Sequence, residues 1–354
     1  MKVVITGCAG LIGSRLAGWI REAQPGAEVI GVDDLSCGYA ENIPPGMAWI
    51  RHSLGSGADP RAATVYGPLW PEHPVPRSLE EAFDGADLVY HTAAYAAEGL
   101  SPWIRQYNYR NNLVATAEVV SACIRHDVGR LVAFSSMAVY GRGRPPFAEA
   151  DRLQPIDPYG VAKVACEWDV RIAGEQHGLD WCIIRPHNVT GHHQSIWQRY
   201  RNVLGIWIAR HLEGLPLRVY GDGRQQRAFS DLAECLEPLW AAGTLPAASG
   251  QVINLGGPTP IEIGAAAELL CEVMAGGTVE HCEPRHEVRE AWCTTAKSEE
   301  LLGYRHRIPL RETLEDLWGW AREAWERYPE RRTTHRVAPL EHDRGLYGYW
   351  RELV

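Results

Sequence analysis

The stretch KVVITGCAGLIG (residues 2–13) decides how the chain begins to fold. Residues 2–6 form an apolar run typical of a buried strand, and residues 11–22 repeat apolar side chains at the spacing of one helix face. The turn between them contains three glycines, Gly7, Gly10 and Gly13. A strand, a glycine turn and a helix in this order predict a loop whose backbone N–H groups can approach the phosphates of a dinucleotide.

Two acids, Asp33 and Asp34, follow the next apolar run at 28–32. A carboxylate at the end of the second strand can accept hydrogen bonds from ribose hydroxyls and would repel a 2′-phosphate, so Asp33 predicts NAD rather than NADP. Asp34 is either a second ribose contact or a solvated neighbour. The residues expected in the cofactor site from these two turns are Gly7, Gly10, Leu11, Ile12, Gly13, Asp33, Asp34, Ser36 and Gly38.

Strands and helices continue to alternate after this unit. Further apolar, β-rich runs lie at 87–94, 129–136 and 181–186, and a helical stretch occupies about 103–126. This alternation predicts an α/β fold, a Rossmann-type doubly wound parallel sheet with helices on both faces. We expect it to form an NAD-binding domain over residues 1–187. The Gly- and Pro-rich residues 52–77 have no sustained period and are interpreted as an irregular insertion.

Beyond residue 187 the alternation becomes irregular, which predicts a smaller C-terminal α/β lobe. Residues 188–330 are expected to form mainly the substrate-binding lobe, with some return to the core. The elements expected there are helices near 198–213, 262–275 and 310–327 and strands at 217–221 and 251–257. A tail, 331–354, would then pack on the body of the protein or on a second subunit.

Composition restricts the class of partner. The 354 residues carry a formal net charge of −9, which leaves no clustered basic surface for nucleic acid or anionic membranes. No apolar run of about 18 residues is present, so no membrane-spanning helix is expected. The nine cysteines are scattered, without metal-ligand spacing, which is typical of reduced cytoplasmic thiols. The expected partner is a small molecule, with no metal, no nucleic acid and no membrane.

Two segments carry the chemistry, FSSMAVYG (134–141) and DPYGVAK (157–163). Tyr159 and Lys163 are four residues apart, so a helix presents both on one face. A neighbouring ammonium and the nicotinamide cation both favour the phenolate, which makes Tyr159 a candidate base. Ser136 follows a strand and can hydrogen-bond the same substrate oxygen. Together these residues predict proton removal from an alcohol, coupled to hydride transfer to NAD.

TGCAGLIG (6–13), HTAA (91–94), SSMAVYG (135–141) and YGVAK (159–163), in this order and spacing, resemble the extended short-chain dehydrogenase/reductase family. The similarity covers about residues 1–325 and points to the branch of nucleotide-sugar epimerases and dehydratases. It implies that Tyr159 is the base, Lys163 its electrostatic partner and ribose anchor, and Ser136 the third catalytic residue. It also implies a homodimer, formed through the helix that carries Tyr159 and the helix before it.

The resemblance also implies the remaining contacts with NAD and a nucleotide-diphosphate sugar. Asn112 matches a largely structural asparagine of the family. Ala93, Ala94 and Pro186 join the cofactor site. Asn188 in RPHNVTG would meet the substrate diphosphate. The other residues expected to bind the substrate are Glu98, Ser136, Asn202, Val203, Arg227 and Arg285, of which the two arginines are candidate diphosphate ligands.

Several positions depart from the family pattern. Ala228 stands where an Asp usually follows the family's arginine, and Ser53 and Leu54 stand in place of the Asp-Ile that often borders the adenine. The frequent Gly-Pro-Arg-Gln sequence is here Gly-His-His-Gln at 191–194. Relatives that hold a uronic acid often use this arginine, so a uronate substrate is disfavoured unless His193 replaces it.

The residue types directly after Ser136 differ among the reactions of this branch. In this sequence they are Met137 and Ala138. Dehydratase relatives carry Asp-Glu there and decarboxylases usually carry Glu nearby, whereas Met and Ala cannot exchange a proton. The pattern therefore predicts an epimerase, most simply at C4 through a 4-keto sugar.

Two alternatives remain open. Glu98 or one of the histidines His187, His192 and His193 would act as the extra acid or base of a dehydratase or of a 3- or 5-epimerase. The other alternative is a non-catalytic NAD-binding protein on the same fold.

Overall fold

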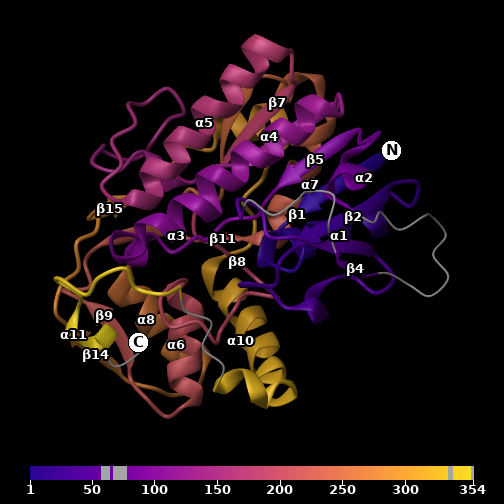
Figure 1. The fold of residues 1–354 in the computed structure, drawn as a ribbon. Coiled ribbons are helices and arrows are strands. Elements are labelled where there is room, and N and C mark those ends of the chain that lie inside the picture. Colours follow the sequence, from indigo (N-terminus) through magenta and orange to yellow (C-terminus); the bar gives the residue numbers. More distant parts are fainter. Residues whose placement is uncertain (57–63, 67–77, 334–337, 352–354) are drawn as a thin grey trace.

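The computed structural model describes residues 1–56, 64–66, 78–333 and 338–351 (Figure 1). Within these residues, eight strands form the central sheet, in the order β12-β7-β6-β5-β1-β2-β3-β4. Neighbouring strands are parallel except for β3 and β4, which are antiparallel. The strands are β1 (Lys2–Thr6), β2 (Glu28–Asp33), β3 (Ala48–Arg51), β4 (Thr64–Tyr66), β5 (Leu88–His91), β6 (Arg130–Phe134), β7 (Trp181–Pro186) and β12 (Gln251–Leu255).

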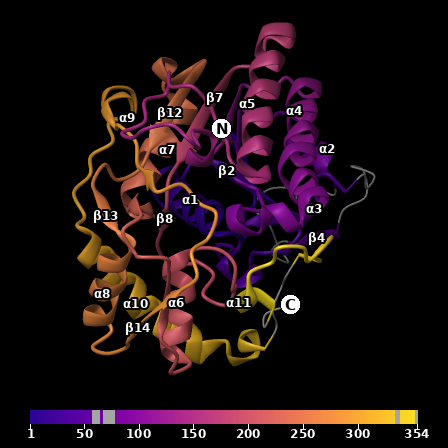
Figure 2. The same cartoon turned by 90° about the vertical axis from the view of Figure 1, so that its left-hand side faces the viewer.

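Helices cover both faces of this sheet (Figures 1 and 2). One face packs against α1 (Leu11–Ala23), α7 (Leu232–Thr244) and α9 (Ala296–Leu302), and the other against α2 (Leu79–Phe83), α4 (Ala115–Arg125) and α5 (Pro158–His177). Central strands are therefore buried on both sides, which explains their nearly continuous Val, Ile and Leu content. The predicted doubly wound α/β fold is confirmed.

The region after β2 contains two strands that the sequence analysis did not predict. Residues 48–51 form an unpredicted strand, β3, which is short and shows no alternation that would reveal it. Residues 64–66, inside the expected irregular insertion 52–77, form strand β4 and pair antiparallel with β3. Such a three-residue strand depends on its partner rather than on its own pattern. Residues 57–63 and 67–77 of the insertion lie outside the described residues.

The helical stretch expected over 103–126 is interrupted. It consists of α3 (Arg105–Tyr109), a π-helical turn (Arg110–Val114) and α4. Asn112, fully buried in the π turn, donates from Nδ2 to the Asn108 carbonyl at 2.9 Å and to the Tyr95 carbonyl at 3.3 Å. Hydrogen bonds of this kind replace the regular helical pattern locally, and π turns are frequent beside functional sites.

A second group of elements forms the lobe below the sheet (Figure 2). Its core packs three helices, α6 (Val203–Leu212), α8 (Ile263–Val273) and α10 (Leu310–Arg327). Small sheets accompany them, in the orders β13-β10-β15, β14-β9 and β11-β8. Their strands are β8 (Val189–Thr190), β9 (Leu217–Tyr220), β10 (Gln226–Ala228), β11 (Ser230–Asp231), β13 (Pro260–Glu262), β14 (Val279–Cys282) and β15 (Glu290–Ala291). Between these lobe segments the chain returns to the main sheet as β12, beside β7.

The described part of the tail, residues 338–351, packs on the body of the same chain and ends in the short helix α11 (Gly348–Arg351). Trp350 of this helix is 1% exposed, against Trp103 and Tyr200. In the described ranges, no helix combines the length and the apolar character that crossing a membrane requires.

Candidate functional site

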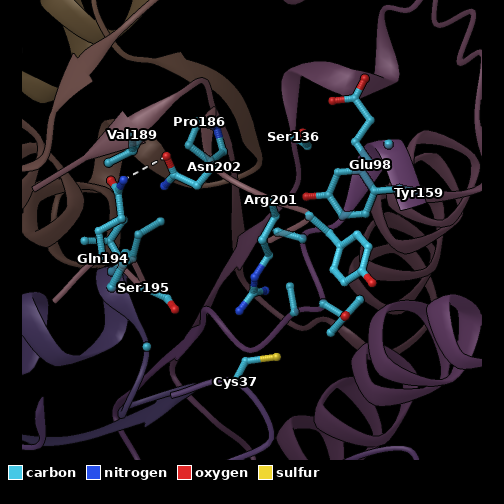
Figure 3. Close-up of a pocket in the computed structure, with 18 of the residues that line it drawn as sticks. Cys37, Glu98, Ser136, Tyr159, Pro186, Val189, Gln194, Ser195, Arg201 and Asn202 are labelled. Atoms are coloured by element: carbon cyan, nitrogen blue, oxygen red, sulfur yellow. Dashed lines mark hydrogen bonds between the residues drawn. The ribbon is translucent and has the colours of Figure 1, made fainter. Parts of the chain in front are cut away.

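A cavity of about 730 Å³ lies between the carboxyl ends of the strands and the lobe. Every residue that the sequence predicted for cofactor or substrate binding lines it. Figure 3 shows Glu98 and Tyr159 on one side of this cavity, Asn202 and Gln194 on the other, and Arg201 reaching between them. The fold therefore brings together groups that are up to 278 positions apart, from Gly7 to Arg285.

The glycine turn leaves room for a phosphate because Gly7, Gly10 and Gly13 have no side chains to fill it. Gly7 has φ +75°, and a Cβ there would lie 2.7 Å from the backbone N of Ala93. A Cβ on Gly13 would collide with the carbonyl of Gly7, whereas Gly10 would meet that oxygen only at 3.3 Å. The steric requirement for glycine thus falls on Gly7 and Gly13. Helix α1 begins directly after Gly10, without a side-chain cap, so its N–H groups remain available to an anion.

Asp33, the last residue of β2, braces this turn. Its Oδ2 accepts from the Ala9 N–H at 2.9 Å and its Oδ1 from the Leu35 N–H at 2.8 Å, and burial raises the pKa of the carboxyl to about 6. Asp34 accepts from the Ser36 N–H at 2.7 Å and from the Ser53 hydroxyl at 2.9 Å. Both acids line the cavity, and the hydrogen bonds of Asp33 fix the shape of the glycine turn.

The three predicted catalytic residues meet at the start of α5. Asp157 caps this helix by accepting the Gly160 N–H at 2.9 Å, and Tyr159 follows in the first turn. Ser136 lies just after β6 and lines the cavity together with Tyr159 and Lys163. The Lys163 ammonium is 5.9 Å from the centre of the Tyr159 ring. The spacing of four residues therefore places both side chains on one face, as predicted.

Burial dominates the electrostatics of this trio. It raises the pKa of Tyr159, and the carboxyls of Glu98 and Asp157 raise it further, while the hydrogen bond with Ser136 lowers it. Burial also lowers the pKa of Lys163, whose Nζ donates to the Phe134 carbonyl at 2.8 Å. The expected effect of Lys163 on the phenol is thus outweighed in this state. Positive charge on a bound nicotinamide would favour the phenolate.

A buried ion pair lies beneath the trio. Glu167, one further turn along α5, receives two hydrogen bonds of 2.7 Å from Arg185 of β7. Glu167 also accepts from the Ser135 hydroxyl at 2.5 Å, and Arg185 donates to the Tyr140 hydroxyl at 2.7 Å. The sequence analysis did not identify Glu167. In the sequence, Glu167 is marked only by its position four residues after Lys163, which itself lies four residues after Tyr159.

Glu98 lies on the opposite wall from the cofactor turn, in the segment Glu98–Trp103. The surface that its side chain exposes faces the cavity beside Tyr159 (Figure 3). Burial within the cavity raises the pKa of Glu98 to about 7, and the carboxyl of Asp157 adds to this effect. Near neutral pH, Glu98 can therefore either give or accept a proton.

The two candidate diphosphate ligands share one carboxylate. The NH2 group of Arg227 lies 3.2 Å from Oε2 of Glu287, and the NH2 group of Arg285 lies 3.6 Å from the same oxygen. The Arg285 guanidinium also covers the Tyr220 ring, at 4.1 Å from its centre. Glu287 thus holds two guanidiniums at one edge of the cavity and neutralises only one of their charges.

Asn188 and Asn202 both have positive φ, 41° and 67°. Asn188 donates from Nδ2 to the Ala228 carbonyl at 2.8 Å, and Asn202 accepts from Gln194 Nε2 at 2.8 Å (Figure 3). Asparagine tolerates this conformation better than most residues, which accounts for its use at both turns.

The three histidines after β7 do not gather around the sugar position. His187 is buried, and its Nε2 lies 2.6 Å from the Gly257 carbonyl; burial lowers its pKa to about 4. His192 pairs with Asp316 at 2.9 Å, outside the cavity lining.

His193 lies at the cofactor end of the cavity, where Nδ1 is 2.8 Å from the Ser14 hydroxyl on α1. His193 is thus bonded to the helix that follows the glycine turn. Of these three histidines, only His187 borders a side cavity of about 80 Å³, which Ser136, Met137 and Ala138 also line.

Residues 3–256 match the family model of the NAD dependent epimerase/dehydratase family. The chain belongs to this family. It is 25% identical over 318 residues to an uncharacterized UDP-glucose epimerase of Bacillus subtilis, covering 89% of this chain and 96% of the relative. It is 28% identical over 334 residues to a dTDP-glucose 4,6-dehydratase of Actinoplanes, covering 91% and 98%. A UDP-glucose 4-epimerase of Mycolicibacterium smegmatis is 28% identical over 320 residues, covering 88% and 96%.

Solved structures agree in fold. The UDP-glucose 4-epimerase of Thermotoga maritima with UDP-glucose has a TM-score of 0.78 at 24% identity, covering 92% of this chain and 99% of that one. MoeE5 in complex with UDP-glucuronic acid and NAD has a TM-score of 0.78 at 25% identity, covering 92% and 100%. The predicted family and NAD as the cofactor are confirmed, and the unfilled turn at Gly7 fits the pyrophosphate of NAD.

Several residues of this epimerase/dehydratase-family cavity were missed by sequence reasoning. Arg201 points into the cavity (Figure 3) with its guanidinium 5.3 Å from the Tyr95 ring. In the sequence, only its position directly before Asn202 indicates that Arg201 lies near the substrate site. The other missed lining residues with polar groups include Tyr200, Arg218, Tyr220, Gln225 and Tyr347. No motif marks Tyr347, because it reaches the cavity only through the packing of the tail.

Proposed function

We propose that the protein is an NAD-dependent epimerase of a nucleotide-diphosphate sugar that inverts C4 through a transient 4-keto sugar. One observation carries the proposal: Ser136, Tyr159 and Lys163 meet in the cavity, while the two positions after Ser136 line its side pocket with Met137 and Ala138. These side chains cannot supply the acid or base that elimination requires. UDP-sugar 4-epimerases among the relatives agree with this choice.

In the proposed reaction, Tyr159 accepts the proton of the C4 hydroxyl and Ser136 hydrogen-bonds the same oxygen. When bound, NAD would supply the group that takes up the C4 hydride and gives it back. Lys163 anchors the ribose beside the nicotinamide. The sugar turns over within the cavity, and Tyr159 then gives its proton back to the C4 oxygen. Atoms and electrons balance, since one proton and one hydride leave and return.

The binding residues divide the cavity into two ends. Gly7 and Asp33 serve the cofactor, whereas Asn188, Arg227 and Arg285 hold the diphosphate of the substrate. Such a division supports a Rossmann domain of residues 1–187 and a substrate lobe within 188–330, as the two functional units. Asn202 and Val203 contact the nucleotide.

Turnover in deuterated water tests the reaction. Candidate UDP and dTDP sugars are incubated with the enzyme, and product sugars are analysed for inversion and for solvent label. We expect inversion at C4 without deuterium on a ring carbon, because the C4 hydride never exchanges with water. Deuterium at C3 or C5, or loss of water from C6, would contradict the proposal.

A second candidate function rests on Glu98. This carboxyl, with its pKa raised to about 7, lies beside Tyr159 and can move a proton at a neighbouring carbon. The chain would then be a dehydratase, or a 3- or 5-epimerase, and a dTDP-glucose 4,6-dehydratase is among its relatives. Glu98→Gln separates the two: lost turnover with intact oxidation of the sugar would favour this second function.

The assembly and compartment are also proposed. Helix α5 exposes Val161, Trp168 and Ile172, and Val114, just before the neighbouring helix α4, is also exposed, which supports a homodimer through these two helices. Nine free cysteines support a reducing, cytoplasmic location.

A further inference from the structure

Residues 338–351 cross between the two walls of the substrate end of the cavity; we call this segment the strap. Its Glu341 N–H donates to the Trp103 carbonyl at 2.9 Å, and Trp103 Nε1 donates to the Arg344 carbonyl at 3.1 Å. Glu341 Oε1 also accepts the N–H groups of Gln106 and Tyr107, at 2.7 and 3.1 Å. The strap is therefore bound to the segment that carries Glu98.

Trp350 anchors the strap. It is 1% exposed and packs edge-on against Trp103 at 5.5 Å and against Tyr200 at 5.6 Å. It also lies over Gly99, where an added Cβ would meet its ring at 3.3 Å. Because of this aromatic packing, Trp350 is part of the buried core, and it fixes the strap against the segment that carries Glu98.

The strap reaches the lobe through two tyrosines. The hydroxyl of Tyr347 accepts the His286 N–H at 2.8 Å, next to Arg285. Tyr349 stacks on Tyr220 with ring centres 4.6 Å apart. One short segment thus joins the Glu98 wall to the wall that carries the candidate diphosphate ligands.

Of the strap residues, Tyr347 alone lines the cavity, among the described residues. Its ring is held from three sides, edge-on against Trp103 at 5.4 Å and Trp350 at 5.3 Å, and parallel to Tyr349 at 5.4 Å. A ring restrained in this way cannot move aside without breaking these contacts. It therefore acts as a rigid wall between Glu98 and Arg285.

We propose that the strap is a built-in wall of the substrate site and that Tyr347 is a specificity-determining residue. The ring of Tyr347 faces the place where sugar and diphosphate join and limits the size of the sugar substituents that fit there. This inference rests on the proposed function, because it takes the occupant of this end to be a nucleotide-diphosphate sugar.

The test compares binding of a small and a bulky sugar on the same nucleotide. Dissociation constants of UDP-glucose and UDP-N-acetylglucosamine, and of dTDP-glucose, are measured by calorimetry with the NAD-loaded wild-type protein and Tyr347→Ala. We expect the variant to shift the ratio of the UDP-sugar constants about fivefold toward the bulkier sugar, since one aromatic contact accounts for an effect of this size. Affinity for NAD should not change.

Tyr349→Ala is the companion variant: it leaves the Tyr347 ring in the cavity but removes one of the three rings that hold it, so it should shift the ratio less than Tyr347→Ala does. If the ratio shifts more in Tyr347→Ala than in Tyr349→Ala, the inference is supported. A different outcome is that wild type binds these sugars but both variants keep its ratio of dissociation constants, or shift that ratio equally. Tyr347 is then not the determinant, and the inference is wrong while the proposed function stands. If wild type binds none of the nucleotide sugars, the proposed function falls and the inference with it. Thermal unfolding of each variant confirms that it is folded.

Discussion

Glu167 of α5 and Arg185 of β7 form a buried two-point ion pair, with both N–O distances at 2.7 Å and exposures of 2% and 1%. The pair ties the helix of Tyr159 and Lys163 to the strand that ends at Pro186 in the cofactor site. Ser135, which also bonds Glu167, is adjacent to Ser136. One carboxylate thus connects the three elements that carry the proposed catalytic residues Ser136, Tyr159 and Lys163 and the cavity residue Pro186.

Glu167→Gln should destabilise the protein by about 3–5 kcal/mol, because it leaves the charge of Arg185 buried without a counter-ion. Chemical denaturation measures this change. Arg171→Ala is the control: Arg171 contacts the same Glu167 at 3.4 Å but is one-third exposed, so a loss of only about 0–1 kcal/mol is expected. Equal stability of wild type and Glu167→Gln would show that the pair does not hold the helix.

Tyr159→Phe should lower kcat by about 10²- to 10⁴-fold, the usual contribution of a positioned acid or base. Binding of NAD and nucleotide sugar should persist, because the ring remains in place. Steady-state kinetics and calorimetry measure the two quantities. Tyr109→Phe, a change of the same kind outside the cavity lining, serves as the comparison. Normal turnover in Tyr159→Phe would exclude catalysis through this site.

Binding of the nucleotide sugar should weaken as pH rises through about 7. Glu98, whose pKa is raised to about 7, is neutral below this pH and negative above it, where it repels a diphosphate. Asp157 and Glu287 add negative charge around it, and Arg227 and Arg285 add positive charge. Calorimetry at pH 6 and pH 8 measures the effect. It should be smaller in Glu98→Gln, and an unchanged pH dependence in that variant would assign it to another group.

Asp33→Asn should reduce the preference for NAD over NADP by about tenfold or more, because hydrogen bonds from ribose to a charged group are lost and repulsion of a 2′-phosphate ends. Asn keeps an acceptor for the Ala9 N–H but loses the one for the Leu35 N–H, so thermal unfolding is measured to check that the variant stays folded. Asp34→Asn, measured alongside, distinguishes its two interpretations: weaker NAD binding indicates a ribose contact, and unchanged binding a solvated neighbour. Cofactor titration by fluorescence gives both affinities.

Trp168→Glu should convert the proposed dimer into monomers. Trp168, Val161 and Ile172 on α5 are 57%, 44% and 42% exposed, and Val114, just before α4, is 48% exposed. A charge within such an apolar face opposes its burial against a second copy. Light scattering after gel filtration measures the mass. Leu215→Glu, at a 43% exposed leucine in the lobe, should leave the mass unchanged. If wild type is itself a monomer, the proposed dimer is wrong.

The sequence predicted most of the regular elements because their signals are local. Strands 2–6 and 181–186 and helix 310–327 have the predicted bounds. The break at 110–114 and strands β3 and β4 were missed, because they depend on partners. The residues just after β3 show this dependence. Glu118 of α4 accepts from the Gly55 N–H at 2.6 Å and from His52 at 2.8 Å, across 63 and 66 positions.

By itself, the sequence determined the doubly wound fold, the glycine turn and the family, and it predicted the trio Ser136, Tyr159 and Lys163, which line one cavity. Apolar periodicity, glycine spacing and a four-residue repeat act over short distances, so a single segment carries each signal. Only the tertiary structure decided which side chains share the cavity: it paired His192 with Asp316 outside the lining and Glu167 with Arg185 beneath it, and it brought Tyr347 to the cavity. Those positions follow from the packing of distant segments, which no local pattern encodes.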